Sequence, residues 1–260
     1  MISFLDNICW REKASRVIPV LIAGLLAGGV ADRAAAGCAD VALVLALDAS
    51  GSITDEEFAS QIDGYVAALT SDQVLASFAE AGVVDVAAVF WGDSAFVPQI
   101  IPWLRITGAR DAVTFASEMR RKKRSVSGNT DIGVGIHAAL ELFREPGRCA
   151  ERRVIDISGD GVASVMARRT DHVALAPVRQ AALDEGVVIN ALAIASREPK
   201  LAEYYRRNVA GGIGAFVMEV ADMAGFARAL SQKLRKELLA HRTGGHPCQQ
   251  ATGEFRCLPS

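Results

Sequence analysis

Several features are absent from this chain, and each absence argues against a class of function. An excess of one charge is lacking, because 28 Lys and Arg face 30 Asp and Glu and leave a formal net charge of −2. A general nucleic-acid binder is therefore not expected. No G-x-G-x-x-G follows the first predicted strand and no G-x-x-x-x-G-K-[ST] occurs, so the usual phosphate cradles are missing. The nucleophile elbow of serine hydrolases is missing too.

An apolar run of membrane-spanning length is also lacking near the N-terminus. The run "VIPVLIAGLLAGGVA" over residues 17–31 has about 15 residues, whereas a spanning helix needs about 20. Arg11, Lys13 and Arg16 precede it and small residues follow, which is the order of a secretory signal peptide. We therefore predict a signal peptide over residues 1–36. The mature chain is expected to be exported, periplasmic or extracellular, with no transmembrane segment.

Cysteine is scarce, with five residues in the chain. Removing the signal peptide takes Cys9 and leaves Cys38, Cys149, Cys248 and Cys257. An even number in an oxidising compartment suggests two disulfides, for which three pairings exist. The stretch "AAGC" before and including Cys38 is also similar to a lipoprotein acylation site, so a lipid anchor on Cys38 is the alternative.

What the chain does contain is an alternation of apolar runs with segments of helical period, typical of a parallel sheet covered by helices. The runs 83–92 and 96–103 are separated by too few residues for a crossover, so this pair should be antiparallel. We predict a three-layer α/β domain over residues 37–240, with helices on both faces of about six mostly parallel strands and one antiparallel edge strand. The segment 241–260 loses helical period and should form a small cysteine-clipped tail. The predicted strands are 41–48, 83–92, 96–103, 152–160, 187–195 and 215–220, and the predicted helices begin near residues 54, 109, 131, 173, 201 and 222.

Three clusters of polar side chains lie where such a sheet should bind its ligand. Asp48, Ser50 and Ser52 follow the first strand, Thr130 stands in a Gly-containing loop, and Asp160 follows a middle strand. In open α/β sheets, ligands bind beyond the carboxyl ends of the strands. Two carboxylates and three hydroxyls form an all-oxygen set, which suits Mg²⁺ and similar hard cations. Strand-end turns and helix caps are the structural alternative for the same residue types.

These residues carry a resemblance to the von Willebrand factor A domain and its metal-ion-dependent adhesion site. D-x-S-x-S after a first strand, a later threonine and an aspartate after a middle strand match that site in order. The stretches "LALDASGSI", "RRVIDISGDG" and "YYRRNVAGGIGAFV" are also similar to a bacterial family of exported A-domain proteins of unknown function. The likeness covers about residues 40–240.

The resemblance implies a non-enzymatic protein that uses a divalent cation, Mg²⁺ or else Mn²⁺ or Ca²⁺, to bind an acidic side chain of a protein partner. The implied ligands are Asp48, Ser50, Ser52, Thr130 and Asp160. The strand order of such domains also places Cys38 beside Cys149, which implies a disulfide between them and leaves Cys248 to pair with Cys257. The rival hypotheses are a metal-dependent hydrolase and a structural envelope protein with a vestigial site; the oligomeric state stays open.

Two further features have alternative interpretations. The basic run "RRKKR" over residues 120–124 is either a solvated helix end or a rim that steers an acidic partner toward the metal. Trp91 ends a predicted strand near the site, where it either packs in the core or lines the binding face.

Overall fold

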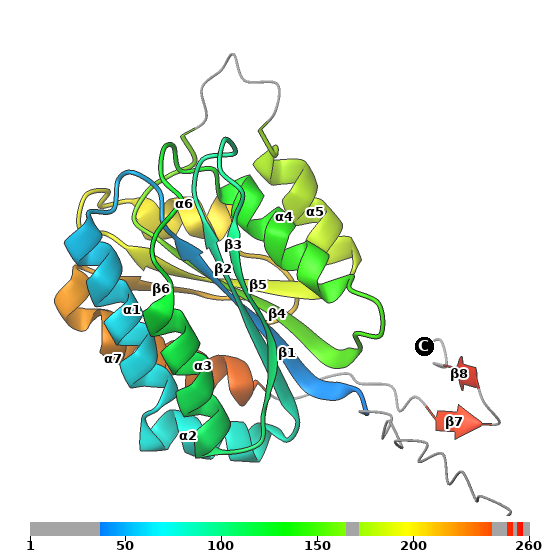
Figure 1. The fold of residues 1–260 in the computed structure, drawn as a ribbon. Coiled ribbons are helices and arrows are strands. Elements are labelled where there is room, and N and C mark those ends of the chain that lie inside the picture. Colours follow the sequence, from blue (N-terminus) through cyan, green and yellow to red (C-terminus); the bar gives the residue numbers. More distant parts are fainter. Residues whose placement is uncertain (1–36, 165–171, 241–248, 252–253, 257–260) are drawn as a thin grey trace, which may run out of the picture. The chain divides into compact units, whose positions relative to one another are not determined.

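The computed structural model describes residues 37–164, 172–240, 249–251 and 254–256. A six-stranded sheet in the order β3-β2-β1-β4-β5-β6 runs through the centre, and helices cover both of its faces (Figure 1). The predicted three-layer α/β architecture is confirmed. The strands of this sheet are β1 (Ala39–Asp48), β2 (Val84–Trp91), β3 (Gln99–Ile106), β4 (Ala150–Gly159), β5 (Val187–Ile194) and β6 (Val217–Val220).

Strand directions follow the prediction of one antiparallel edge. β1 pairs in parallel with β2 and β4, β4 with β5 and β5 with β6, while β3 is antiparallel to β2. The edge strand begins at Gln99 rather than at Phe96. Asp93 closes a turn before it, accepting the backbone N–H of Ala95 on Oδ1 at 2.8 Å and that of Phe96 on its carbonyl at 2.9 Å. The turn uses residues that the apolar pattern assigned to the strand.

The helices of the described residues agree with the predicted segments, except that one was missed. The missed helix, α2, begins after Ser71, whose hydroxyl accepts the N–H of Val74, and it packs Val74 and Phe78 into the core. Only two residues separate this helix from the preceding one, so the two helices form one continuous segment in the sequence pattern. The helices are α1 (Asp55–Leu69), α2 (Asp72–Ala81), α3 (Ala109–Arg121), α4 (Ile132–Phe143), α5 (Leu175–Asp184), α6 (Leu201–Asn208) and α7 (Met223–Leu238).

β1 explains why the sheet needs helices on both faces. Its ten residues are almost entirely buried, as expected of a central parallel strand. Because successive side chains point to opposite faces, Leu43, Leu45 and Leu47 pack with α1, α2, α3 and α7, whereas Val44 and Ala46 pack with α4, α5 and α6. Two separate hydrophobic cores therefore clamp the strand that ends at Asp48.

The amino end of β1 is tied covalently to that of β4. Ala39 lies beside Ala150 in the parallel register, and the preceding residues, Cys38 and Cys149, form a disulfide with their Cα atoms 4.8 Å apart. In the tail, β7 (Gln249–Ala251) and β8 (Glu254–Arg256) form a separate antiparallel pair. The predicted signal peptide and the Cys248–Cys257 pairing lie outside the described residues. Among the helices that are described, none has both the length and the apolar character needed to cross a membrane.

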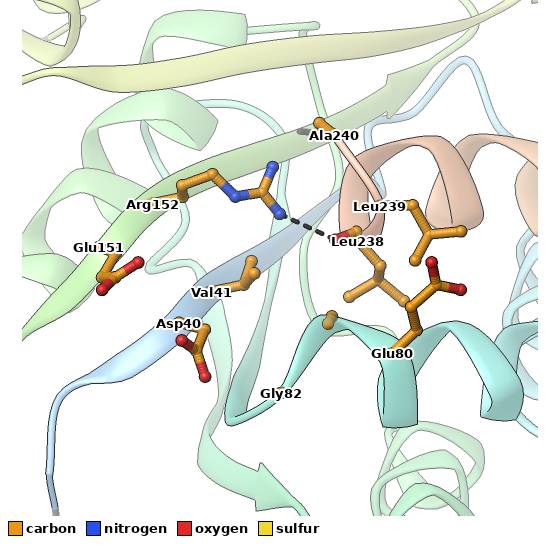
Figure 2. A pocket seen from close by; sticks show the side chains of 10 residues that line it. Asp40, Val41, Glu80, Gly82, Glu151, Arg152, Leu238, Leu239 and Ala240 are labelled. Carbon is orange, nitrogen blue, oxygen red and sulfur yellow. Dashed lines mark hydrogen bonds between the residues drawn. The ribbon is translucent and has the colours of Figure 1, made fainter. Parts of the chain in front are cut away.

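A hollow of about 340 Å³ lies at this same amino end of the strands (Figure 2). Asp40 and Arg152 line it from β1 and β4, Glu80 from α2, and Leu238 from the end of α7. The guanidinium of Arg152 donates to the carbonyl of Leu238 at 3.0 Å (Figure 2). It also donates to the carbonyl of Glu237 at 2.9 Å, and so holds the last turn of α7. The hollow therefore marks an anchoring point of α7, at the edge of the sheet opposite to the predicted metal ligands.

Candidate metal centre

The predicted ligands lie at the point where the strand order of the sheet reverses. From β1 the chain moves to β2 on one side, and later returns to place β4 on the other. Loops that leave two such neighbouring strands diverge, and ligands of open α/β sheets bind in the crevice between them. Asp48 ends β1 and Asp160 directly follows β4, so both carboxylates reach this crevice.

The structure brings all five predicted oxygen donors together. The hydroxyls of Ser50 and Ser52 are 3.0 Å apart, and that of Ser50 is 3.3 Å from the hydroxyl of Thr130. Ser52 donates its hydroxyl to Oδ1 of Asp160 at 2.7 Å, and the backbone N–H of Ser50 donates to Oδ1 of Asp48 at 2.8 Å. Residues from three loops thus form one connected group, in which the bonded pair Ser52 and Asp160 is 108 positions apart in the sequence.

Asp48 carries the clearest sign that a cation belongs here. Its side chain is fully buried, and its second oxygen, Oδ2, has no hydrogen-bond partner within the described part of the chain. Burial raises the pKa of this carboxyl from its usual 3.8 to about 7, against the lowering effect of the hydrogen bonds from Ser50. An unpaired buried carboxylate is costly unless a positive charge compensates it. A cation bound at Oδ2 would provide that compensation.

The donor set fits a hard divalent cation. Octahedral Mg²⁺ holds oxygens at 2.0–2.1 Å, so neighbouring ligands lie about 2.9 Å apart. The spacings between the hydroxyls and Asp160 span 2.7–3.3 Å, which brackets this value. Over the described residues no group of three or more His, Cys, Asp or Glu side chains gathers as a metal site. The two carboxylates therefore depend on the three hydroxyls to complete a ligand set.

A second loop is held against the first by backbone contacts. The N–H of Gly51 donates to the carbonyl of Gly128 at 2.8 Å, and a side chain at Gly128, whose φ is +81°, would collide with Asp93. Thr130 is fixed from the other side, because its N–H donates to the hydroxyl of Ser164 at 3.1 Å. Thr130 is 5% exposed and so keeps its hydroxyl directed into the centre rather than into solvent.

Sequence reasoning missed Arg197, which follows β5 and contacts the centre. Its guanidinium donates to Oδ2 of Asp160 at 2.5 Å and to both carboxylate oxygens of Glu57 at 2.8 and 2.9 Å. Arg197 is the main cause of a lowered pKa at Glu57. Thr54 and Glu57 form a capping box at the start of α1, but nothing in the local pattern indicated an arginine beside it. No spacing rule connects residues 140 positions apart.

The remaining sequence features lie as follows. Trp91 is fully buried against Gly135 of α4, so it belongs to the core and not to an open face. In the basic run, Arg120 pairs with Asp63 on the surface, as a solvated helix end would. Arg124 instead reaches the loop of the centre, donating to the carbonyl of Ile53 at 2.5 Å and pairing with Asp55 at 3.1 Å.

The fold is that of von Willebrand factor A domains, and solved structures share it. The von Willebrand factor domain of the type V pili tip protein Mfa5 from Porphyromonas gingivalis superposes with a TM-score of 0.56 at 12% identity, over 80% of this chain and 98% of that one. The open conformation of the pilus adhesin SpaC from Lactobacillus rhamnosus GG gives 0.56 at 12% identity over 78% of this chain. This chain spans only 30% of SpaC.

A third similar structure is proximal thread matrix protein 1 from the mussel byssus, solved with zinc occupying its MIDAS motif. It gives a TM-score of 0.51 at 16% identity, covering 77% of this chain and 46% of its own. No curated protein matches the chain significantly. The profile of one family, described as "Protein of unknown function (DUF1194)", matches residues 37–242. The chain belongs to this family.

Proposed function

We propose that this protein is exported and binds a divalent cation, Mg²⁺ in the first place and Mn²⁺ or Ca²⁺ as alternatives, to grip an acidic side chain of a protein partner. Asp48, Ser50, Ser52, Thr130 and Asp160 would hold the ion, directly or through water. The observation that carries the proposal is that the side-chain oxygens of Ser50, Ser52, Thr130 and Asp160 lie within hydrogen-bond distance of one another, beside the buried carboxylate of Asp48, whose Oδ2 has no partner among the described residues. The zinc-occupied MIDAS of the byssus protein supports a cation on this fold.

The chain's own residues provide the binding face. Ser52 is the one exposed member of the set, so the ion would be accessible to solvent beside Ser52. Asp48 and Ser50 are buried and would bind the ion from the protein interior. When bound, the ion supplies a positive charge and a free coordination position. A carboxylate is the partner group that a hard cation prefers. The pilus proteins among the similar structures support an envelope or extracellular location.

Partner capture in the presence and absence of metal tests this function. The purified protein is immobilised and exposed to an envelope extract in Mg²⁺ or in EDTA, next to Asp48→Asn and to Asp55→Asn as a matched control. Asp55 lies in the next turn, is 84% exposed and pairs with Arg124 rather than with the centre. We expect a partner retained in Mg²⁺ by the wild type and by Asp55→Asn, and lost in EDTA or with Asp48→Asn. Equal retention in all four conditions would contradict the proposal.

The rival hypothesis of a metal-dependent hydrolase predicts a different result with the same proteins. Phosphate and ester substrates would be turned over in Mg²⁺ by the wild type and not by Asp48→Asn. We expect no metal-dependent turnover by either. Turnover that requires Asp48 would replace the adhesive function with a catalytic one.

A further inference from the structure

Arg197 is hydrogen-bonded to Asp160, one of the two carboxylates of the candidate centre. One amino group of its guanidinium, Nη1, donates to Oδ2 of Asp160 at 2.5 Å and to the carbonyl of Ser52 at 2.7 Å. The other, Nη2, donates to both oxygens of Glu57. The guanidinium therefore connects the loop after β1, the first turn of α1 and the end of β4. It is the kind of planar, two-pronged contact that arginine makes best.

The two carboxylates of the centre consequently differ in how many of their oxygens accept hydrogen bonds. Asp48 has a buried oxygen without a partner in the described chain, whereas both oxygens of Asp160 accept hydrogen bonds, one from Ser52 and one from Arg197. The Asp160 side chain is only 4% exposed, so water screens its attraction to Arg197 from the side of the arginine, which is 45% exposed. A carboxylate already neutralised by a cation attracts a second cation less strongly.

We propose that Arg197 is an internal counter-ion that competes with the metal ion for Asp160, so that metal binding requires Arg197 to release this carboxylate. The inference rests on the proposed function, since it assumes that a divalent cation binds among these oxygens. Glu57 would keep the released arginine bound at the rim, because it accepts both hydrogen bonds of Nη2 independently of Asp160. The side chain of Arg197 is 45% exposed, so Nη1 can turn toward solvent without entering the core.

The chain offers a matched control for this competition. Arg124 and Arg197 donate to the carbonyls of two consecutive residues, Ile53 and Ser52. Both are therefore positive charges on the same loop, but Arg124 pairs with the exposed Asp55 and touches none of the five oxygen donors. Neutralising either arginine removes one charge from this rim, and only neutralising Arg197 frees Asp160.

Calorimetric titration of Mg²⁺ and Mn²⁺ into the wild type, Arg197→Gln and Arg124→Gln tests the proposal. We expect Arg197→Gln to bind the metal roughly tenfold more tightly, the usual size of a coupling between two binding events. Arg124→Gln should change the affinity by about twofold or less at 0.15 M salt, because Arg124, whose side chain is 19% exposed, contacts none of the five oxygen donors and pairs with Asp55, which is 84% exposed. Arg197→Lys keeps the charge but loses the two-pronged contact, so its affinity should fall between wild type and Arg197→Gln. It also serves as the test variant if Arg197→Gln does not fold.

Each other outcome has a definite meaning. An equal gain in Arg197→Gln and Arg124→Gln would show a general charge effect and overturn the competition. Unchanged or weaker binding by Arg197→Gln and Arg197→Lys would overturn it as well, and would make Arg197 a support of the centre. Binding by Arg197→Gln alone, with none by the wild type, would support the competition strongly. Absence of binding in every protein would refute the metal centre itself, and the inference would fall with it.

Discussion

At the scale of single residues, the centre depends on how closely the backbone of β4 approaches Asp48. A Cβ atom added at Gly159 would lie 2.9 Å from Oδ2 of Asp48 and 2.6 Å from the hydroxyl of Tyr205. Both neighbours are fully buried, so neither can move aside into solvent. The absence of a side chain at position 159 therefore leaves room at Oδ2 of Asp48, the oxygen for which the described residues provide no partner.

Gly159→Ala should damage both the fold and the metal centre. Overpacking in a well-packed core costs about 1–3 kcal/mol, and here the added methyl group also faces the oxygen that would bind the cation. We expect a lower free energy of unfolding in EDTA and weaker Mg²⁺ binding, measured by denaturant titration and calorimetry. Gly225→Ala is the control, because a Cβ there meets nothing within 4 Å. Wild-type stability and affinity in Gly159→Ala would contradict this role of the glycine.

The residues of the centre differ in how far the sequence alone reveals them. Asp48, Ser50 and Ser52 alternate directly after an apolar run, so their neighbourhood could be predicted from local spacing. Asp160 likewise ends an apolar run. Arg197 could not be predicted, because its position depends on how the loop after β5 folds over α1, and no periodic pattern encodes that approach.

At the scale of elements, α7 is attached to the sheet by buried charges. Lys233 is fully buried and lies 2.5 Å from Oδ1 of Asp156 on β4 and 2.5 Å from Oε1 of Glu237. The amide of Asn190 on β5 donates to the same Glu237 oxygen at 3.0 Å. One ammonium thus faces two carboxylates, and this cluster joins α7 to two strands.

The apolar seam of α7 could be predicted, and the charge cluster could not. Phe226, Leu230 and Leu234 recur at a spacing of four, and all three are buried. Lys233 and Glu237 are also four residues apart, a spacing that is usual for exposed ion pairs on helices. Their burial is determined by Asp156, which lies between Ile155 and Ile157 in the buried half of β4 and belongs to another part of the chain.

The charge cluster predicts a pH-dependent stability. Burial, reinforced by the charge of Asp156 and opposed by Lys233, raises the pKa of Glu237 from 4.5 to about 8. Between these values Glu237 holds a proton in the folded protein that the unfolded chain has released, so its contribution to stability is largest at low pH and falls as the pH rises toward 8. Arg152, whose pKa is itself lowered by burial, is the other charged group near Glu237.

Glu237→Gln removes this titration and gives the test. We expect denaturant unfolding in EDTA to show a smaller loss of stability between pH 5 and pH 8 in Glu237→Gln than in the wild type. Asp48 titrates in the same direction, so the difference between the two proteins isolates Glu237. Parallel pH profiles for both proteins would show that Glu237 does not hold a proton in the folded state.

At the scale of the whole molecule, β1 has the disulfide at one end and the candidate metal centre at the other. The disulfide of Cys38 stands before its first residue and Asp48 is its last, about 30 Å away for ten residues of strand. The disulfide closes a loop of 111 residues, so it restricts the unfolded chain strongly. The candidate metal centre does not share a residue or a loop with it.

Stability and metal binding should therefore respond separately to loss of the disulfide. We expect the double variant Cys38→Ser and Cys149→Ser to lose up to roughly 5 kcal/mol of unfolding free energy, as chain-entropy arguments give for such a loop. Its Mg²⁺ affinity should equal that of the wild type at a temperature where both are folded. A parallel loss of affinity would show that the two ends of β1 are coupled. Denaturant titration and calorimetry on the same samples measure both quantities.

The layers of the fold could be predicted, and the order of its strands could not be predicted from pattern alone. The apolar run of β1 is long and buried on both faces, which indicates a central strand without naming its neighbours. Which strands flank it depends on how the connections cross the sheet, a property of the whole chain. The placement of Cys38 beside Cys149 depends on the same order and came from the resemblance to the A domain.

Anomalous diffraction from crystals of the protein soaked in Mn²⁺ tests the metal centre most directly. We predict a single strong anomalous peak within coordination distance of Asp48 and of the hydroxyls of Ser50 and Ser52, with Thr130 and Asp160 around it and Nη1 of Arg197 turned away from Asp160. Crystals of Asp48→Asn treated in the same way should lack the peak. An empty centre in the wild type, with Arg197 still bound to Asp160 at saturating Mn²⁺, would contradict the assignment.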